Sequence, residues 1–339
     1  MKTTYLLLCL LGIGSVSGAG QTKQPQKIGD FIESTSYNEH RRNATRSLQY
    51  TPDGDDFVCI NGKNRFTRAL YGSHTAFRLE TSDRPVFAAY TKENPKHICF
   101  KLQTSGGTVA LDSTEHCESR YTAGRRSYSL SDPAFGGGSL SITTWALPDK
   151  EGAIWQFNAR NFKGSNPILL ASISEIRNSK LNRNGDMGAD PADSFEAPLQ
   201  PQQLQSCPAQ IDGTLYILLE NQELRTLTTA EGENLFKKAE AARSETASRI
   251  RIETPDPYFN TLGGTLAMAA DGIWDGEVWL HGAIGWRMRL SGWRAAYTGD
   301  VLGWHDRART HFNAYAASQV TEVPNTLPHP AQDSALHLA

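Results

Sequence analysis

Short apolar runs separated by turn residues dominate the first two thirds of the chain. The turns include the dipeptide Asn61-Gly62 and a run of three glycines at residues 136–138. Many short strands without intervening helices are typical of an antiparallel sandwich, and we expect one over residues 51–227. The apolar runs lie at residues 57–60, 86–90, 98–102, 140–145, 154–157, 168–173 and 215–219.

From residue 228 the apolar spacing changes to steps of three and four, which predicts a helix. Thr228 followed by Glu231 matches a capping box at its beginning. Pro255 and Pro257 end the pattern, so we expect a linker helix over residues 228–254. Its apolar face is expected to contain Leu235, Ala239, Ala242, Thr246 and Ile250.

Two further helices are expected within residues 255–320. The first covers about 258–270, where the pair Gly263-Gly264 requires close packing against a neighbour. Asp300 can cap the second helix, which is predicted to end near Val320. One side of that helix is expected to carry Trp304, Ala308, Phe312, Tyr315 and Ala316.

The two ends of the chain have different compositions. Residues 1–20 have the pattern of a cleavable secretory signal peptide, with Lys2, an apolar segment at 5–16 and small residues before Gln21. No later segment is long and apolar enough to span a bilayer, so an exported protein without membrane attachment is predicted. Residues 21–50 are predicted to be a polar linker, and residues 321–339 an irregular tail.

Composition excludes some classes of protein. The formal net charge of −2 gives no basic excess of the kind that nucleic-acid binders carry. Cys59, Cys99, Cys117 and Cys207 follow the signal peptide, and they can form up to two disulfides or remain free thiols. They contain no CxxC spacing, and no metal or cofactor is predicted. For residues 182–193, rich in Asn, Asp and Gly, we favour a polar loop over a Ca²⁺ site.

The most unusual stretch is residues 271–306, which contains five of the seven tryptophans together with arginines, histidines and carboxylates. Flat aromatic rings can stack on the apolar faces of sugars, and the polar groups can bind sugar hydroxyls. The alternative is a packed aromatic layer with ion pairs and cation–π contacts. A tryptophan followed by an arginine occurs twice in this stretch, at Trp286-Arg287 and at Trp293-Arg294. Either arginine could bind a uronic-acid carboxylate.

The sequences at residues 57–80 and 282–312 resemble DUF4450, a family of large secreted proteins of polysaccharide-degrading Bacteroidetes. The chain is also similar to the six-hairpin glycosidases, as shown by the segments Trp274-Asp275-Gly276-Glu277 and Thr298-Gly299-Asp300. This resemblance implies an antiparallel β-supersandwich, a linker helix and an (α/α)6 toroid. A toroid of about twelve helices needs roughly 300 residues, so we expect only its first hairpin or hairpins, an incomplete toroid.

The resemblance implies hydrolysis of glycosidic bonds in a polysaccharide or oligosaccharide, and the two Trp-Arg units extend the candidates to acidic ones. Such hydrolysis uses two carboxyl groups, and the candidates are Asp275, Glu277 and Asp300, with Asp306 a fourth whose position in the first turn of a helix has a structural explanation. An incomplete toroid predicts a chain that is catalytically incomplete alone; a non-catalytic glycan-binding protein and an inactive fragment are the alternatives. Sugar contacts are predicted for Trp274, Trp286, Arg287, Trp293, Arg294 and His281.

Overall fold

The computed structural model describes residues 49–72, 77–90, 95–164, 166–178, 192–281 and 292–317, which all belong to one compact unit, Leu48–Ala339. Side chains at 203–204 and 292–296 are not described. The predicted signal peptide, nearly all of the polar linker, the tail and most of the loop at 182–193 therefore lie outside the described residues.

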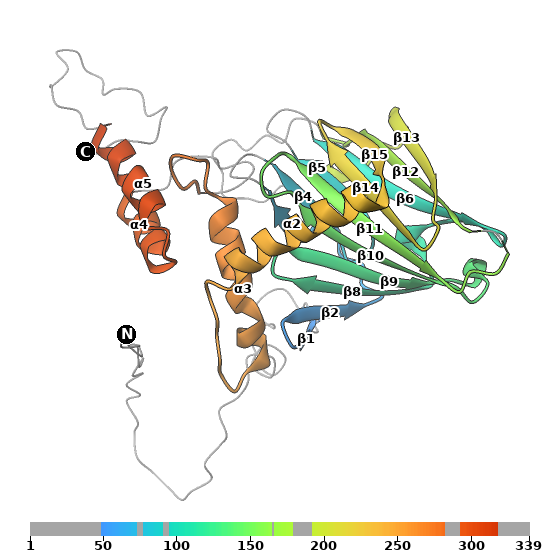
Figure 1. Cartoon of the computed structure of the whole chain (residues 1–339), viewed down its shortest axis with the longest axis horizontal. Helices are drawn as coiled ribbons and strands as arrows, with labels where there is room; N and C mark the ends of the chain where they lie inside the picture. The colour runs from blue at the N-terminus through green and yellow to red at the C-terminus, as the bar shows by residue number, and fades with distance from the viewer. Residues whose placement is uncertain are drawn as a thin grey trace, which may run out of the picture. The chain divides into compact units, whose positions relative to one another are not determined.

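Two antiparallel sheets form the part of the chain before residue 228 (Figure 1), which confirms the predicted sandwich. Over the described residues, the first sheet has eight strands in the order β1-β2-β8-β9-β10-β11-β14-β15. These strands are β1 (Thr51–Asp53), β2 (Asp56–Ile60), β8 (His116–Thr122), β9 (Arg125–Ser131), β10 (Ser139–Ala146), β11 (Gly152–Arg160), β14 (Thr214–Glu220) and β15 (Glu223–Leu227).

The second sheet has the order β13-β12-β6-β5-β4-β3, with β7 paired to β6, among the residues described. Its strands are β3 (Arg68–Tyr71), β4 (Arg78–Thr81), β5 (Val86–Tyr90), β6 (Lys96–Thr104), β7 (Gly107–Ala110), β12 (Ile168–Glu175) and β13 (Gln203–Gln210). Short 3₁₀ helices η1 (Leu111–Ser113), η2 (Pro133–Phe135) and η3 (Ala192–Phe195) occur in the connections.

Every apolar run in the sequence falls on a strand, but several strands have no such run. Strands β8 and β9 alternate instead: Cys117, Tyr121, Tyr128 and Leu130 are buried, and the residues between them are mostly polar. A strand with one face in the core needs an apolar residue only at every second position. A search for continuous apolar runs therefore misses such strands.

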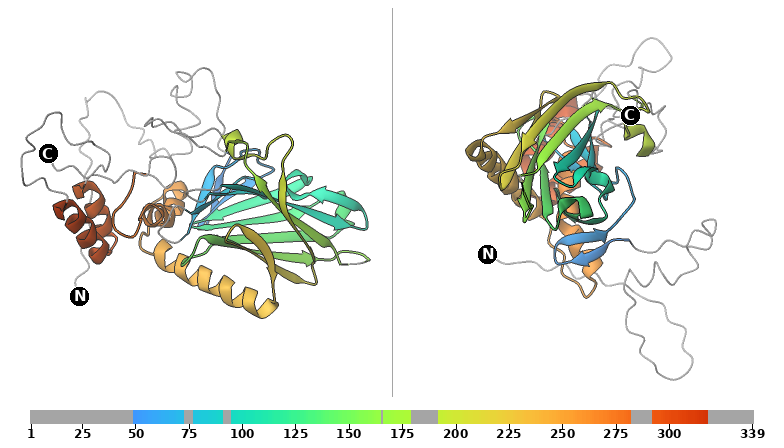
Figure 2. Two further views of the ribbon diagram at one scale, coloured as in Figure 1. Left: turned by 90° about the horizontal axis from the view of Figure 1, so that it is seen from above. Right: turned by 90° about the vertical axis from the view of Figure 1, so that its right-hand side faces the viewer.

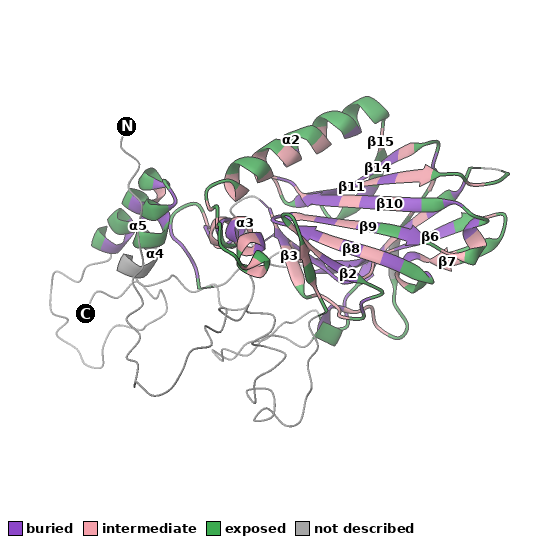
Figure 3. Cartoon of the chain, turned by 90° about the horizontal axis from the view of Figure 1, so that it is seen from below, coloured by how far each residue is buried: buried purple, intermediate pink, exposed green. Residues whose placement is uncertain are grey.

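The main core lies between the two sheets, where the strands are coloured as buried in Figure 3. Trp155 of the first sheet makes edge-to-face contacts with Phe87 and Phe100 of the second, at centroid distances of 5.5 and 5.6 Å. This geometry is preferred by aromatic pairs and fixes the two sheets against each other.

A polar network is buried near this core. Asp83 and Arg126 are both fully buried, and the Arg126 Nη2 to Asp83 carboxylate distance is 3.5 Å. Asp83 also accepts hydrogen bonds from the Tyr50 hydroxyl and from the Asn64 backbone N–H, the latter at 2.8 Å. Arg126 donates to the Ser82 carbonyl at 2.9 Å. These contacts connect the loop after β2 with the β4–β5 turn.

Helix α2 (Thr229–Ala247) lies along the outer face of the first sheet (Figures 1 and 2). Thr228 and Glu231 form the predicted capping box. Phe236 of the helix contacts Trp145 and Tyr216 of the sheet at centroid distances of 5.6 and 6.0 Å. The helix ends at Ala247, several residues earlier than predicted.

Three helices follow: α3 (Pro257–Gly272), α4 (Gly292–Val301) and α5 (His305–Ala317). The close packing predicted at Gly263-Gly264 is confirmed, because a β-carbon on Gly263 would lie 2.9 Å from the Ile250 carbonyl oxygen. A β-carbon on Gly264 would lie 3.0 Å from that of Ala123. These three helices are the last elements of the described chain.

Two details predicted for α5 were wrong. Asp300 does not cap this helix, because it lies in the last turn of α4. The predicted stripe included Phe312, which is exposed, whereas His311 is fully buried. The buried positions of α5 are Ala308, His311, Ala314 and Tyr315. Because histidine is polar, the spacing of apolar residues did not show that His311 lies on the buried side.

The four cysteines of the described chain are free thiols: Cys59, Cys99, Cys117 and Cys207. None of the helices among the described residues is long and apolar enough to cross a membrane.

Candidate functional site

The end of α3 and the beginning of α5 enclose a cluster of tryptophans. Trp274, Trp279 and Trp304 are at most 8% exposed and pack with Leu302. The rings of Trp274 and Trp279 lie 4.5 Å apart, and the two residues pair as an isolated antiparallel bridge. The Trp279 indole N–H donates to the Ala270 carbonyl at 3.2 Å. These three tryptophans therefore form a small core of the helical region.

A tight turn stands on this core at residues 275–277. Oδ1 of Asp275 accepts the backbone N–H groups of Glu277 and Val278, at 2.9 and 2.7 Å. Gly276 has a φ of 102°, a conformation that favours glycine. The Asp275 carboxylate is thus used in holding the turn, while Glu277 is exposed. Of these two candidate carboxylates, Glu277 is the one that can reach a large ligand from solvent.

Arginines pack on the tryptophans as well. The guanidinium of Arg307 lies 4.5 Å from the ring centroid of Trp304 and 5.6 Å from that of Trp274, and it pairs with Asp271 at 2.7 Å. Arg249, which follows α2, lies over Trp304 at 5.2 Å and donates to the Leu302 carbonyl. Cation–π packing within the protein, one of the two interpretations of the stretch, is present at these positions.

A hollow of about 250 Å³ lies beside these contacts, between α2 and the helical region. Its lining includes Asp271, Trp304 and Arg307, together with Arg243 of α2 and Arg249, which follows that helix. The hollow therefore lies between both ends of the aromatic stretch and the C-terminal half of α2.

The other predicted site residues are more dispersed. Asp300 and His305 form an exposed pair with a 2.6 Å contact, and His281 is exposed at the edge of the described residues. Asp306 is exposed and pairs with Arg309 at 3.1 Å. Their roles in catalysis or sugar binding stay predictions. Trp286 and Arg287 lie outside the described residues, and Trp293 and Arg294 lie on α4 with side chains that are not described.

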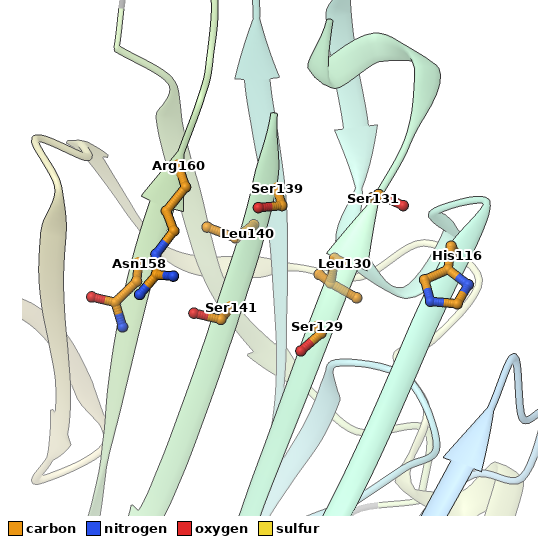
Figure 4. Close-up of a pocket in the computed structure, with 9 residues that line it drawn as sticks. All are labelled: His116, Ser129, Leu130, Ser131, Ser139, Leu140, Ser141, Asn158 and Arg160. Atoms are coloured by element: carbon orange, nitrogen blue, oxygen red, sulfur yellow. The ribbon is translucent and has the colours of Figure 1, made fainter. Parts of the chain in front are cut away.

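A second hollow, of about 360 Å³, lies on the outer face of the first sheet, on β8–β11 (Figure 4). It is lined by hydroxyl, amide, imidazole and guanidinium groups, and two leucines complete it. The polar residues are His116, Ser129, Ser131, Ser139, Ser141, Asn158 and Arg160. Such a surface offers many hydrogen-bond groups and no aromatic platform.

The outer face of the second sheet carries a cluster of reactive groups that the sequence analysis did not identify. Cys99 and His97 occupy alternate positions of β6, and Glu196 follows η3. The Cys99 sulfur lies 3.1 Å from the Ser172 hydroxyl. A histidine two residues from a cysteine on a strand was the available signal, but nothing in the sequence connects Glu196 with it.

The pKa values in this cluster are perturbed. Burial lowers the pKa of His97, but its interactions with Cys99 and Glu196 outweigh burial and raise that pKa to about 8. Burial raises the pKa of the Cys99 thiol, but hydrogen bonds with His97 and Ser172 outweigh it and leave the pKa below its usual value. Both shifts favour a thiolate beside an imidazolium.

A protein-family profile matches the middle of the chain. Residues 95–250 match the profile of DUF4450, a domain of unknown function. The match supports the predicted DUF4450 family. It covers the sandwich from β6 onward together with α2, and neither of the two segments that first indicated the family lies within it. No curated protein matches the chain.

No group of three or more His, Cys, Asp and Glu side chains suited to a metal ion occurs in the part of the chain that the structure describes.

Proposed function

We propose that the chain belongs to an exported carbohydrate-active protein of the six-hairpin glycosidase type, which hydrolyses glycosidic bonds in a polysaccharide. In this proposal the sandwich precedes an α-helical toroid, and α3, α4 and α5 are its first helices. The order of elements supports the proposal, since two antiparallel sheets, a helix lying on one of them and further helices follow one another along the chain.

The observation that carries the proposal is the turn at residues 275–277. A carboxyl group that protonates a glycosidic oxygen must be held in a fixed position relative to the sugar. The backbone of Glu277 is held in this way, because its N–H donates to Asp275 and the turn rests on buried Trp274 and Trp279, and we infer that this turn presents the Glu277 carboxyl to the sugar. We assign Glu277 as the carboxyl that contacts the sugar, Asp275 as the residue that positions it, and Asp300 as a second candidate carboxyl.

Apolar side chains exposed on the helices support a larger helical assembly. Leu266 of α3 is 52% exposed, Val301 of α4 is 85% exposed and Phe312 of α5 is 48% exposed. Solvent exposure of large aliphatic and aromatic groups on three neighbouring elements favours a surface that other helices cover. In a toroid each hairpin packs on the next in this way.

The proposal is tested with Glu277→Gln, which removes the acid while preserving size. Because an incomplete toroid is expected to be catalytically incomplete alone, binding to a panel of neutral and acidic polysaccharides would be measured for the wild type and the variant. We expect Glu277→Gln to weaken binding about tenfold or more, since it removes a charged hydrogen-bond partner of the sugar. Glu223→Gln, at an exposed position at the beginning of β15, is the matched control and should leave binding unchanged.

The choice of substrate has its own test. Arg287 and Arg294 would bind a uronic-acid carboxylate, so replacing either with Gln should weaken binding to acidic polysaccharides more than to neutral ones. Equal weakening for both classes of polysaccharide would exclude the uronic-acid assignment.

Glycan binding without hydrolysis is the second candidate, and the hollow on β8–β11 favours it. Neighbouring strands there present Ser129, Ser141 and Asn158 on one face (Figure 4), and sugar hydroxyls pair well with such groups. This candidate predicts retardation of the chain in gels that contain polysaccharide, without reducing-end release. Asn158→Ala combined with Arg160→Ala should abolish the retardation, whereas Glu277→Gln should not.

A further inference from the structure

Two chemically reactive side chains share the outer face of the seven-stranded sheet. Cys99 lies in register between Val86 of β5 and Ser172 of β12, and His97 occupies the preceding position on the same face of β6. Residues two apart on a strand point to the same side. Neither residue is used by the proposed carbohydrate chemistry, which involves residues 271–306.

A chain of polar contacts extends from Cys99 through His97. The Cys99 sulfur contacts the Ser172 hydroxyl at 3.1 Å, and Nε2 of His97 lies 3.7 Å from a Glu196 carboxylate oxygen. Arg65 in turn holds Glu196 at 3.1 Å. His97 is only 7% exposed, and its Nε2 makes no hydrogen bond that satisfies normal geometry among the described residues. A thiol and an imidazole thus share one face of β6, with a carboxylate beside the imidazole, the groups that an activated nucleophile uses.

We propose that Cys99 is a nucleophilic thiol that reacts with small disulfides, with His97 as its base and Glu196 as the residue that positions the imidazole. Cys99 is partly exposed, which gives a small molecule access. Its pKa is lowered from the usual value, which favours the thiolate, the form that attacks a disulfide.

The reaction is a thiol–disulfide exchange. The thiol proton passes to His97, and the Cys99 thiolate attacks one sulfur of the small disulfide. A new S–S bond to Cys99 forms as the S–S bond of the small disulfide breaks, and the departing thiolate takes the proton back from His97. One disulfide is consumed and one mixed disulfide and one small thiol are formed, so no other oxidant is needed.

The remaining cysteines provide internal comparison. Burial raises the pKa of Cys117 to about 12 and raises the pKa values of Cys59 and Cys207 above the usual value. Cys207 is partly exposed like Cys99 but has no histidine partner among the groups that affect its pKa. It is therefore the matched control within the same molecule.

Other charged groups around the cluster are few among the described residues. Asp112 opposes ionisation of Cys99, but Arg65 pairs with Asp112 at 2.8 Å as well as with Glu196. Among the groups that affect the pKa of Cys99, the positive one is His97, so its removal should slow the reaction of the thiol.

The experiment uses iodoacetamide and oxidised glutathione as probes on the full chain, with mass spectrometry of peptides to follow each cysteine. At pH 6.5 we expect Cys99 to be alkylated faster than Cys207, since the pKa of Cys99 is lowered and that of Cys207 is raised, so that Cys99 has the larger thiolate fraction. Oxidised glutathione should add one glutathionyl group at Cys99 and none in Cys99→Ser.

Two variants separate a positioning role from a structural one. His97→Gln should slow alkylation of Cys99 about tenfold at pH 6.5 but much less at pH 9, where the thiol ionises without help. Ser172→Ala, which leaves His97 intact, should slow alkylation of Cys99 by a smaller factor. It replaces His97→Gln if circular dichroism shows that His97→Gln does not fold. Equal rates for Cys99 and Cys207, or an equal loss in His97→Gln at both pH values, would overturn the proposal.

Discussion

The buried pair Asp83–Arg126 gives the strongest prediction of stability. Both side chains are fully buried, and Asp83→Ala would leave the Arg126 guanidinium without its counter-charge. The substitution also removes the acceptor for the Asn64 N–H and the Tyr50 hydroxyl. Breaking a buried ion pair by removing one partner costs about 3–5 kcal/mol.

A loss of that size is a large share of the roughly 5–15 kcal/mol that stabilises a typical folded protein. Urea denaturation followed by tryptophan fluorescence measures it as a lower midpoint at an unchanged slope. Asp149→Ala is the matched control, because Asp149 pairs with Lys238 at an exposed position, where ion pairs contribute about 0–1 kcal/mol.

A double variant tests the cause of the loss. Replacing Arg126 with Met in the Asp83→Ala background removes the unpaired charge, so the double variant should be more stable than Asp83→Ala alone. If Asp83→Ala and Asp149→Ala lower the midpoint equally, or if the double variant is less stable than Asp83→Ala, an unpaired buried charge is not the cause of the loss of stability.

Three further predictions concern other parts of the fold. Thr228→Ala should cost about 1 kcal/mol in urea denaturation by removing the cap that Thr228 forms with Glu231, and an unchanged midpoint would argue against the capping box. Gly299→Ala should cost about 1–3 kcal/mol, because a β-carbon there would lie 2.1 Å from the Trp279 ring; a neutral effect would mean that α4 does not pack on this ring. The pKa of His97 is about 8 in the folded chain against 6.5 for a free histidine, so its stabilising effect is complete below pH 6.5 and is lost as the pH rises through 8. The stability difference between wild type and His97→Gln should therefore shrink over that window by at most about 2 kcal/mol, and a difference that grows with pH would contradict the assignment.

The strands were predictable where burial on one or both faces concentrates apolar residues. Val86–Tyr90 was predicted with its observed bounds, since most of this strand is buried. Strand β9, with serines at its outward positions, could not be found by the same reasoning. Helix α2 was predictable from Thr228 and Glu231, because a capping box involves residues only three apart.

The candidate sites were less predictable, because they depend on contacts between distant residues. The sequence showed tryptophans and arginines together but could not show that Trp274 and Trp304 would be buried under Arg307. Likewise, His97 and Glu196 are close only because a loop returns to the face of β6. Periodicity determines which face of an element is apolar, whereas a site depends on which elements meet.

The carboxylate of Glu277 carries the central claim, and one measurement tests it most directly. Each polysaccharide of the panel would be incubated with wild type, Glu277→Gln and Glu223→Gln, and both binding and reducing-end release would be recorded. The account predicts that the wild-type chain binds at least one polysaccharide, that Glu277→Gln retains the fold but binds it more weakly, and that Glu223→Gln binds it like the wild type. Equal binding by all three proteins, or no binding to any polysaccharide, would contradict it.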